Sequence, residues 1–153
     1  MDPTAVSRFI TTEFSGVEVA EASGDTFFFA GPDRRMPFAT LVTGDRYDTA
    51  SDLDRPGVFR LNIGVSRATY QSLFGPDPAR LGEDGVVDTG HDFTTLDRIM
   101  PHPVYAPQFW VCVLNPGPET WETVRSLLTE AHARAARRQR PTPAPPPPDS
   151  APG

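Results

Sequence analysis

Arg60 and Asn62 are the residues whose types and spacing point most directly to chemistry. They lie in the apolar segment 58–65, and an extended chain places residues two apart on the same face of a strand. A guanidinium can hold a carboxylate or a phosphate through two hydrogen bonds, and a neighbouring amide can donate and accept. The pair therefore predicts one wall of a binding site for a polar or anionic ligand. The alternative is that Arg60 pairs with Asp52 or Asp54 at the sheet surface.

His102 is the second candidate, because it stands between Pro101 and Pro103, whose rings restrict the backbone. An imidazole held in this way titrates near neutral pH and can act as a general acid or base. Tyr105 follows closely in the chain and is predicted to line the same site. The alternative is a turn in which the imidazole of His102 bonds to a backbone carbonyl.

Trp110 and Cys112 fall in the segment 109–114, which is apolar on both faces of an extended chain and so indicates a central strand. Trp110 is predicted to form the apolar wall of a ligand pocket, and burial in the core is the alternative. Cys112 could act as a nucleophile. Its valine neighbours instead favour a buried thiol that resists ionisation and stays inert.

Three carboxylates, Asp25, Asp92 and Asp97, are candidates for acid–base chemistry, but each suits a simpler structural function. Asp25 follows a glycine and favours a turn, Asp92 favours a helix start, and Asp97 favours a solvated helix face. His91, Asp92 and His102 lie close in sequence, yet no HxH or HxxxH spacing supports metal binding. No metal ion or cofactor is therefore predicted.

The elements that position these side chains follow from hydrophobic periodicity and turn residues. Asp2 and Pro3 suit the start of a helix, whose apolar stripe ends before Gly16. Further helices are predicted at 67–74, 92–100 and 119–138, and strands at 17–22, 26–30, 38–43, 58–65 and 109–114. The polar run 46–57 is predicted to be an exposed connection.

The order of these elements indicates an α+β fold, because tight turns between the early strands favour antiparallel pairing. We expect a single domain over residues 1–140, with an antiparallel sheet of about five strands and helices mainly on one face. It includes an N-terminal helix and a long C-terminal helix. The segment 141–153, PTPAPPPPDSAPG, is predicted to be a disordered proline-rich tail.

Composition limits the classes of partner. The chain has 20 acidic and 14 basic residues, a net charge of −6, and every basic residue is arginine. This balance disfavours nucleic-acid binding, so the arginines within 134–140 are interpreted as a solvated helix end that complements the helix dipole. One cysteine, no secretory signal and no apolar run of membrane-spanning length predict a cytoplasmic protein without membrane contact.

Several motifs occur together in a known order. They are GDTFFF at 24–29, MPFATLVT at 36–43, RPGVFRLNIGV at 55–65, LFG at 73–75, DFTTLDRIMPHPVYAP at 92–107 and WVCVLNPG at 110–117. This series, spanning residues 8–135, resembles the bacterial family called domain of unknown function 6194. The layout of elements is also similar to the MmcQ/YjbR-like α+β architecture, some members of which have been considered DNA-binding. The first resemblance implies no activity, and the acidic charge speaks against the DNA binding suggested by the second.

Three functional hypotheses follow. The leading one is binding of a small polar or anionic ligand on the helix-poor sheet face, lined by Arg60, Asn62, His102, Tyr105 and Trp110. The second is a small enzyme that uses His102 as acid or base in the same pocket. The third is a protein-interaction module, acting as a monomer or homodimer, that engages partners through the proline tail or by dimerisation.

Overall fold

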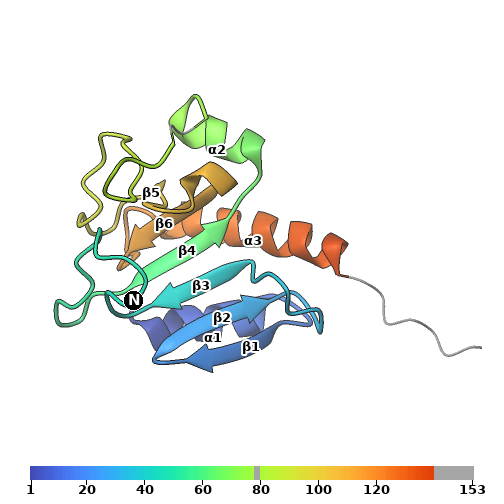
Figure 1. Ribbon diagram of the computed structural model, residues 1–153. Helices are drawn as coiled ribbons and strands as arrows, with labels where there is room; N and C mark the ends of the chain where they lie inside the picture. Colours follow the sequence, from blue (N-terminus) through green and yellow to red (C-terminus); the bar gives the residue numbers. More distant parts are fainter. Residues whose placement is uncertain (78–79, 140–153) are drawn as a thin grey trace, which may run out of the picture.

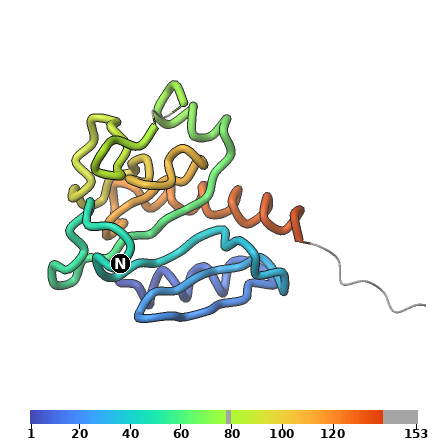
Figure 2. The backbone as a smooth tube through the Cα atoms, in the orientation of Figure 1, coloured from blue at the N-terminus to red at the C-terminus, as the bar shows by residue number. Residues whose placement is uncertain are grey.

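The fold is built on a six-stranded antiparallel sheet, seen in a computed structural model that describes residues 1–77 and 80–139 (Figure 1, Figure 2). The strand order is β1-β2-β3-β4-β6-β5, and each neighbouring pair is antiparallel. In chain order the elements are α1 (Pro3–Glu13), β1 (Glu18–Ala22), β2 (Asp25–Phe29), β3 (Ala39–Val42), β4 (Arg60–Gly64), α2 (Arg67–Phe74), β5 (Met100–Pro101), the 3-10 helix η1 (Ala106–Gln108), β6 (Trp110–Leu114) and α3 (Trp121–Arg138).

Helices α1 and α3 lie against the same face of the sheet (Figure 1). Helix α1 starts at its predicted cap, because the Asp2 carboxylate accepts a hydrogen bond from the Ala5 backbone N–H at 2.8 Å. Its apolar stripe buries Val6 and Ile10. The buried residues of α3 are Val124, Leu127, Leu128 and Ala131. Both helices therefore turn an apolar stripe toward the sheet, as an amphipathic helix must.

Side-chain alternation divides the centre of the sheet into two unlike faces. The register aligns Leu61 with Val113, and these apolar side chains share the face that α1 and α3 cover. The same register aligns Asn62 with both Thr40 and Cys112 on the opposite side, which we call the polar face. The predicted α+β fold with helices mainly on one face is confirmed.

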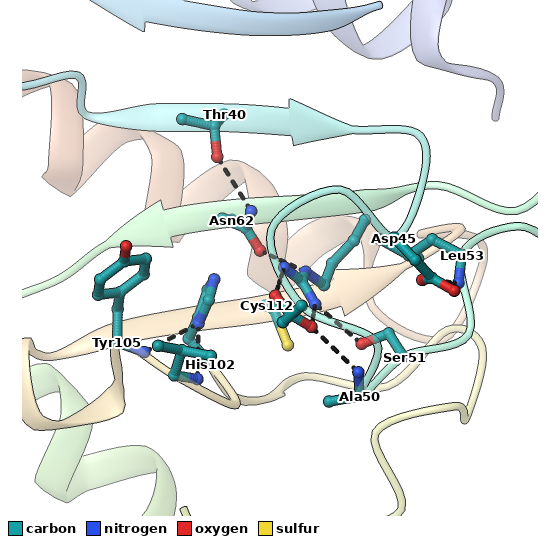
Figure 3. A network of polar contacts seen from close by, with 12 residues as sticks. Thr40, Asp45, Ala50, Ser51, Leu53, Asn62, His102, Tyr105 and Cys112 are labelled. Carbon is teal, nitrogen blue, oxygen red and sulfur yellow. Dashed lines mark hydrogen bonds and ion pairs between the residues drawn. The ribbon is translucent and has the colours of Figure 1, made fainter. Parts of the chain in front are cut away.

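The long connection between β3 and β4 folds over the polar face (Figure 3). Its composition predicts an exposed segment at 46–57, and this prediction is wrong for part of the run. Ser51 and Leu53 are almost completely buried. The Asp45 carboxylate accepts a hydrogen bond from the Leu53 backbone N–H at 2.7 Å, which folds the connection back so that Leu53 reaches the core.

The predicted helix at 92–100 is also wrong. Asp97 adopts a φ of 53°, which a right-handed helix cannot contain. Met100 and Pro101 then form the short strand β5, which pairs with β6. The sheet thus has six strands where about five were predicted, because a two-residue strand leaves no periodic signal in the sequence.

The remaining predicted helices and strands are confirmed, with small shifts at their ends. Ser66 caps α2 as its type suggests, because its hydroxyl accepts a hydrogen bond from the Thr69 backbone N–H at 3.0 Å. The proline-rich tail predicted at 141–153 lies outside the described residues. In the described part of the chain, no helix combines the length and apolar character needed to cross a membrane.

Asp97 holds the start of α3 from a distant loop. Its carboxylate accepts hydrogen bonds from the backbone N–H groups of Gly117 at 2.8 Å and Glu119 at 3.1 Å. The Thr120 hydroxyl donates a third bond at 2.6 Å. Burial raises the pKa of Asp97, but these bonds outweigh burial and hold the pKa below its ordinary value. Asp97 therefore braces the turn that leads into α3, whereas its predicted place was on a helix face.

Replacing Asp97 with Ala is expected to lower the free energy of unfolding by about 1–2 kcal/mol, because the turn that leads into α3 loses its acceptor. Urea unfolding measures the change. Asp92→Ala is the matched control, since the exposed Asp92 bonds to Thr94 in the same loop and should matter less.

The effect of Asp97 should also depend on pH. A carboxyl with a lowered folded pKa stabilises the fold above its unfolded pKa and loses this contribution as pH falls through the folded pKa. The difference between wild type and Asp97→Ala should therefore be constant above about pH 5 and shrink below about pH 4. A difference that grew on acidification would contradict the role of the Asp97 carboxylate as an acceptor for this turn.

Candidate functional site

A buried ion pair joins β4 to the connection that covers the polar face. The Arg60 guanidinium donates to both carboxylate oxygens of Asp48, at 3.0 Å from Nη1 and 2.8 Å from Nη2. Only 1% of the Arg60 side chain and 9% of the Asp48 side chain are exposed. Burial raises the pKa of Asp48, but the hydrogen bonds and charge of Arg60 outweigh it and leave that pKa lowered. The ion-pair partner of Arg60 is thus Asp48, and not Asp52 or Asp54, the two carboxylates that the sequence suggested.

Neighbouring polar groups use further donors of this guanidinium (Figure 3). Nε of Arg60 donates to Asn62 Oδ1, and Nη1 donates to the Ser51 hydroxyl, each at 3.0 Å. The Asn62 amide nitrogen in turn donates to the Thr40 hydroxyl at 3.0 Å. Among the described residues, every buried polar side-chain atom has a partner. The network is therefore satisfied internally and ties the connection to the sheet.

His102 lies beside this network and is 3% exposed. Its Nδ1 accepts hydrogen bonds from the backbone N–H groups of Val104 at 3.1 Å and Tyr105 at 3.0 Å, so its proton resides on Nε2. Burial, aided by the positive charge of Arg60 and opposed by Asp48, lowers the pKa of His102 to about 3. The imidazole is therefore neutral at pH 7 and shapes a turn, as a hydrogen-bond acceptor from the backbone.

Cys112 and Tyr105 border the same network. Cys112 is fully buried, its thiol lies 3.5 Å from the Pro101 carbonyl oxygen, and burial raises its pKa to about 12. Such a thiol is not ionised at neutral pH and is a poor nucleophile. Tyr105 is 55% exposed, and its ring centre lies 5.1 Å from that of His102. It forms the open border of the polar face (Figure 3).

The other candidate carboxylates have structural partners. Asp25 is fully buried, pairs with Arg46 at 2.6 Å and accepts from the Thr43 backbone N–H at 3.0 Å. Asp92 accepts from the Thr94 backbone N–H at 3.0 Å and closes a turn, so its predicted place at a helix start is wrong. Within residues 1–77 and 80–139, no group of three or more potential ligands is arranged to hold a metal ion.

The structure brings together most, but not all, of the residues predicted to line a ligand site. Arg60, Asn62 and His102 meet on the polar face, with Tyr105 beside them. Trp110 lies apart, because it pairs with the opposite end of β4 from Arg60. The predicted lining is therefore divided between a buried network and a separate open region around Trp110.

That open region is a groove of about 550 Å³, where the ends of β4 and β6 face the second half of α3. Its lining includes Arg35, Gly64, Trp110, Arg134 and Arg138. Ala131 and Ala135 belong to the same lining, and their small side chains leave space on the helix surface. The groove thus combines an aromatic wall with cationic side chains.

The arginines that α3 contributes to the groove are close to one another. Neither Arg134 nor Arg138 makes an ion pair with any described residue. Burial lowers the pKa of Arg134, and the charges of Arg138 and Arg137 lower it further against the opposing charge of Glu130. Arg134 still keeps its proton near neutral pH. An anion in the groove would relieve this repulsion.

The loop before β3 forms the other wall of the groove. Asp33 in this loop pairs with Arg35 at 2.7 Å. The Gln139 side chain contacts the same loop twice: it accepts from the Asp33 backbone N–H at 2.9 Å and donates to the Asp33 carbonyl at 3.0 Å. A side chain at Gly31 would meet the Gln139 amide oxygen at 2.7 Å, so glycine permits this approach. We call this contact the Gln139 clasp.

Sequence interpretation missed the cationic side of the groove. The run 134–140 was expected to be a solvated helix end, yet Arg134 and Arg138 line a groove. One signal was present: the two arginines lie one helical turn apart, on the face that also carries Ala131 and Ala135. That spacing does not reveal which strand ends the helix face meets, so it could not have identified the groove alone.

Comparisons with known proteins give one result. The sequence model of a family described as a family of unknown function, DUF6194, matches residues 1–143. No curated protein and no solved structure matches the chain. The similarity to the MmcQ/YjbR-like architecture therefore stays a prediction.

Breaking the buried ion pair should be costly. Asp48→Asn is expected to lower the free energy of unfolding by about 3–5 kcal/mol, because it leaves the charge of Arg60 buried without a counter-charge. Urea unfolding measures this loss. Asp52→Asn is the control, because the Asp52 side chain is 60% exposed and forms an ion pair with Arg55 at the surface, with 3.7 Å between Oδ2 and Nε. If both variants cost the same, the Arg60–Asp48 pair does not organise the polar face.

His102 should remain neutral far below neutral pH. Its pKa of about 3 predicts an NMR titration curve that stays flat from pH 8 to about pH 4.5. Between the unfolded value near 6.5 and the folded value, only the unfolded chain binds the proton, so His102 destabilises the fold as pH falls below about 6.5. The urea-unfolded chain is the control. A folded-state midpoint near pH 6 would instead leave His102 available for acid–base chemistry.

Proposed function

The chain belongs to the DUF6194 family of unknown function, and we propose that it binds a small anionic molecule in the groove between α3 and the ends of β4 and β6. The observation that carries this proposal is the pair of guanidinium groups, Arg134 and Arg138, that line the groove and pair with no described carboxylate. A groove of about 550 Å³ is within the usual range for small-molecule sites, roughly 300–1,000 Å³.

The charge balance of the groove favours an anion even at a helix C-terminus. The C-terminal end of α3 contributes a partial charge of about −0.5, which opposes anion binding. Arg134 and Arg138 together carry two full positive charges, so they outweigh the helix dipole. Arg35, across the groove, is already paired with Asp33 and adds hydrogen-bonding capacity more than charge. A carboxylate or phosphate fits this arrangement.

The residues that the sequence predicted to line a site on the sheet face have separate roles in this proposal. Trp110 is among the residues that line the groove, and we assign it the apolar wall in this proposal. Arg60 and Asn62 support the scaffold, because their polar groups bond to Asp48 and to one another. Tyr105 stays exposed at the border of the polar face, outside the groove.

The alternatives have less support. An enzyme using His102 as acid or base requires a titratable imidazole near neutral pH, whereas burial lowers the pKa of His102 to about 3. Interaction through the proline-rich segment 141–153 concerns residues outside those described. The net charge of −6 continues to disfavour a nucleic-acid backbone as the anion.

The test uses citrate and inorganic phosphate as probes, with sodium chloride holding the ionic strength constant. At about ten times its Kd, a bound anion should raise the Tm of the full chain by about 3–5 °C. The double variant Arg134→Gln/Arg138→Gln should lose this shift. Arg137→Gln is the matched control, because Arg137 is an exposed arginine on the same helix that does not line the groove.

Two results would contradict the proposal. One is the absence of stabilisation by any small carboxylate or phosphate at matched ionic strength. The other is an equal loss of stabilisation in Arg137→Gln, which would assign the effect to the net charge of the helix end. Isothermal titration with the same three proteins separates binding from a general salt effect.

A further inference from the structure

We propose that the polar face carries a second binding site, in which the Nε2–H group of His102 donates a hydrogen bond to the carbonyl oxygen of a small uncharged molecule. Tyr105 forms the exposed wall of this site. The site is independent of the groove, because neither His102 nor Tyr105 lines the groove. The proposal depends on the fixed orientation of the imidazole, on an N–H group that bonds to no described residue, and on the balance of charge around it.

The turn after β5 holds the imidazole of His102 in one orientation. Its Nδ1 accepts hydrogen bonds from the backbone N–H groups of Val104 at 3.1 Å and Tyr105 at 3.0 Å, so Nε2 carries the ring proton. Pro101 and Pro103 restrict the backbone on both sides of the histidine. The donor is therefore held in place before a ligand binds, and its pairing costs little conformational entropy.

This donor has no acceptor among the described residues. The hydrogen bonds of the His102 side chain are the two that end on Nδ1. Because every fully enclosed polar side-chain atom of the described residues has a partner, Nε2 must be an atom that solvent can reach. His102 is only 3% exposed, so the approach to Nε2 is narrow. A projecting carbonyl oxygen is a group that could reach this donor and satisfy it.

Tyr105 lies directly beside the donor. Its ring centre is 5.1 Å from that of His102, and the ring planes are tilted by 47°. Figure 3 shows the Tyr105 hydroxyl and the second ring nitrogen of His102 turned to the same side, toward β4 and away from the turn that binds Nδ1. The hydroxyl makes no hydrogen bond to another described residue, and Tyr105 is 55% exposed. The donor is thus bordered by an accessible side chain that can also contact a ligand.

The charges around the donor favour an uncharged ligand. The guanidinium of Arg60 bonds to both carboxylate oxygens of Asp48, so this pair has no net charge. Burial lowers the pKa of His102 to about 3, and the imidazole is therefore neutral at pH 7. An anion at Nε2 would lose hydration without gaining an unpaired cation, whereas an amide or ketone carbonyl loses much less on leaving water.

The experiment titrates N,N-dimethylacetamide into the full chain and follows the Nε2–H group of His102 by ¹⁵N NMR. This probe has a carbonyl acceptor, no N–H donor and no charge. Acetate is the charged comparison, and sodium chloride keeps the ionic strength constant. We expect a saturable shift of the Nε2–H signal with dimethylacetamide and an affinity for acetate at this signal that is at least fivefold weaker.

His102→Asn tests the donor while the turn is kept, because the asparagine Oδ1 can replace Nδ1 as the acceptor from the backbone. The variant should bind dimethylacetamide at least fivefold more weakly, measured from the backbone amide signals of Tyr105 and Cys112, with an unchanged circular dichroism spectrum. His91→Asn is the matched control, because the half-buried His91 bonds through Nδ1 to Thr89 and should not affect binding.

Each outcome decides a separate point. A Nε2–H signal that does not respond to dimethylacetamide in a saturable way would overturn the proposal, since the donor would then pair with water alone. Equal or tighter binding of acetate at this signal would contradict an uncharged ligand. Undiminished binding in a folded His102→Asn protein would exclude His102 as the donor. If that variant does not fold, the wild-type titration decides alone. None of these results bears on anion binding in the groove.

Discussion

A guanidinium inside a sheet is the constraint on which the polar side of this molecule depends. Arg60 occupies a central strand, where an unpaired charge would lose several kcal/mol of solvation. Its charge is balanced by Asp48, which belongs to a connection that would otherwise be solvated. Because Asp48 must reach Arg60, the whole connection folds over the sheet and carries Ser51 and Leu53 into buried positions. One long-range pair thus organises a segment that has little regular structure.

Different interactions stabilise the two faces of the sheet. On the helix-covered face, α1 and α3 pack apolar stripes against residues such as Leu61 and Val113, and burial of apolar area stabilises the contact. On the polar face, hydrogen bonds from Arg60 to Asp48 and Ser51 hold the covering segment. Asn62 and Thr40 extend this network across the sheet. The groove lies where the strands end, at a junction of helix and sheet, so neither type of packing fills it.

The sequence predicted the parts of this fold that depend on local signals. Periodicity and capping residues identified α1, α2, α3 and the five longer strands, because those segments carry enough residues to repeat a pattern. The turn at Asp97 could not be predicted, since its carboxylate bonds to residues about twenty positions later. The same applies to the site: Arg60 and Asn62 were correctly placed on one strand face, but the choice of Asp48 as partner and the groove beside Trp110 depend on tertiary contacts.

The Gln139 clasp has a consequence for how the protein can diversify. Gln139 contacts only main-chain atoms of Asp33, so the anchorage of the loop before β3 does not depend on the side chains that this loop carries. Positions such as Met36, which is 63% exposed at the rim of the groove, are therefore free to vary while the wall keeps its position. A side chain at Gly31 would meet the Gln139 amide oxygen at 2.7 Å, so a substitution there would displace the clasp. Substitutions on this wall can thus change the lining of the groove without rebuilding the scaffold beneath it.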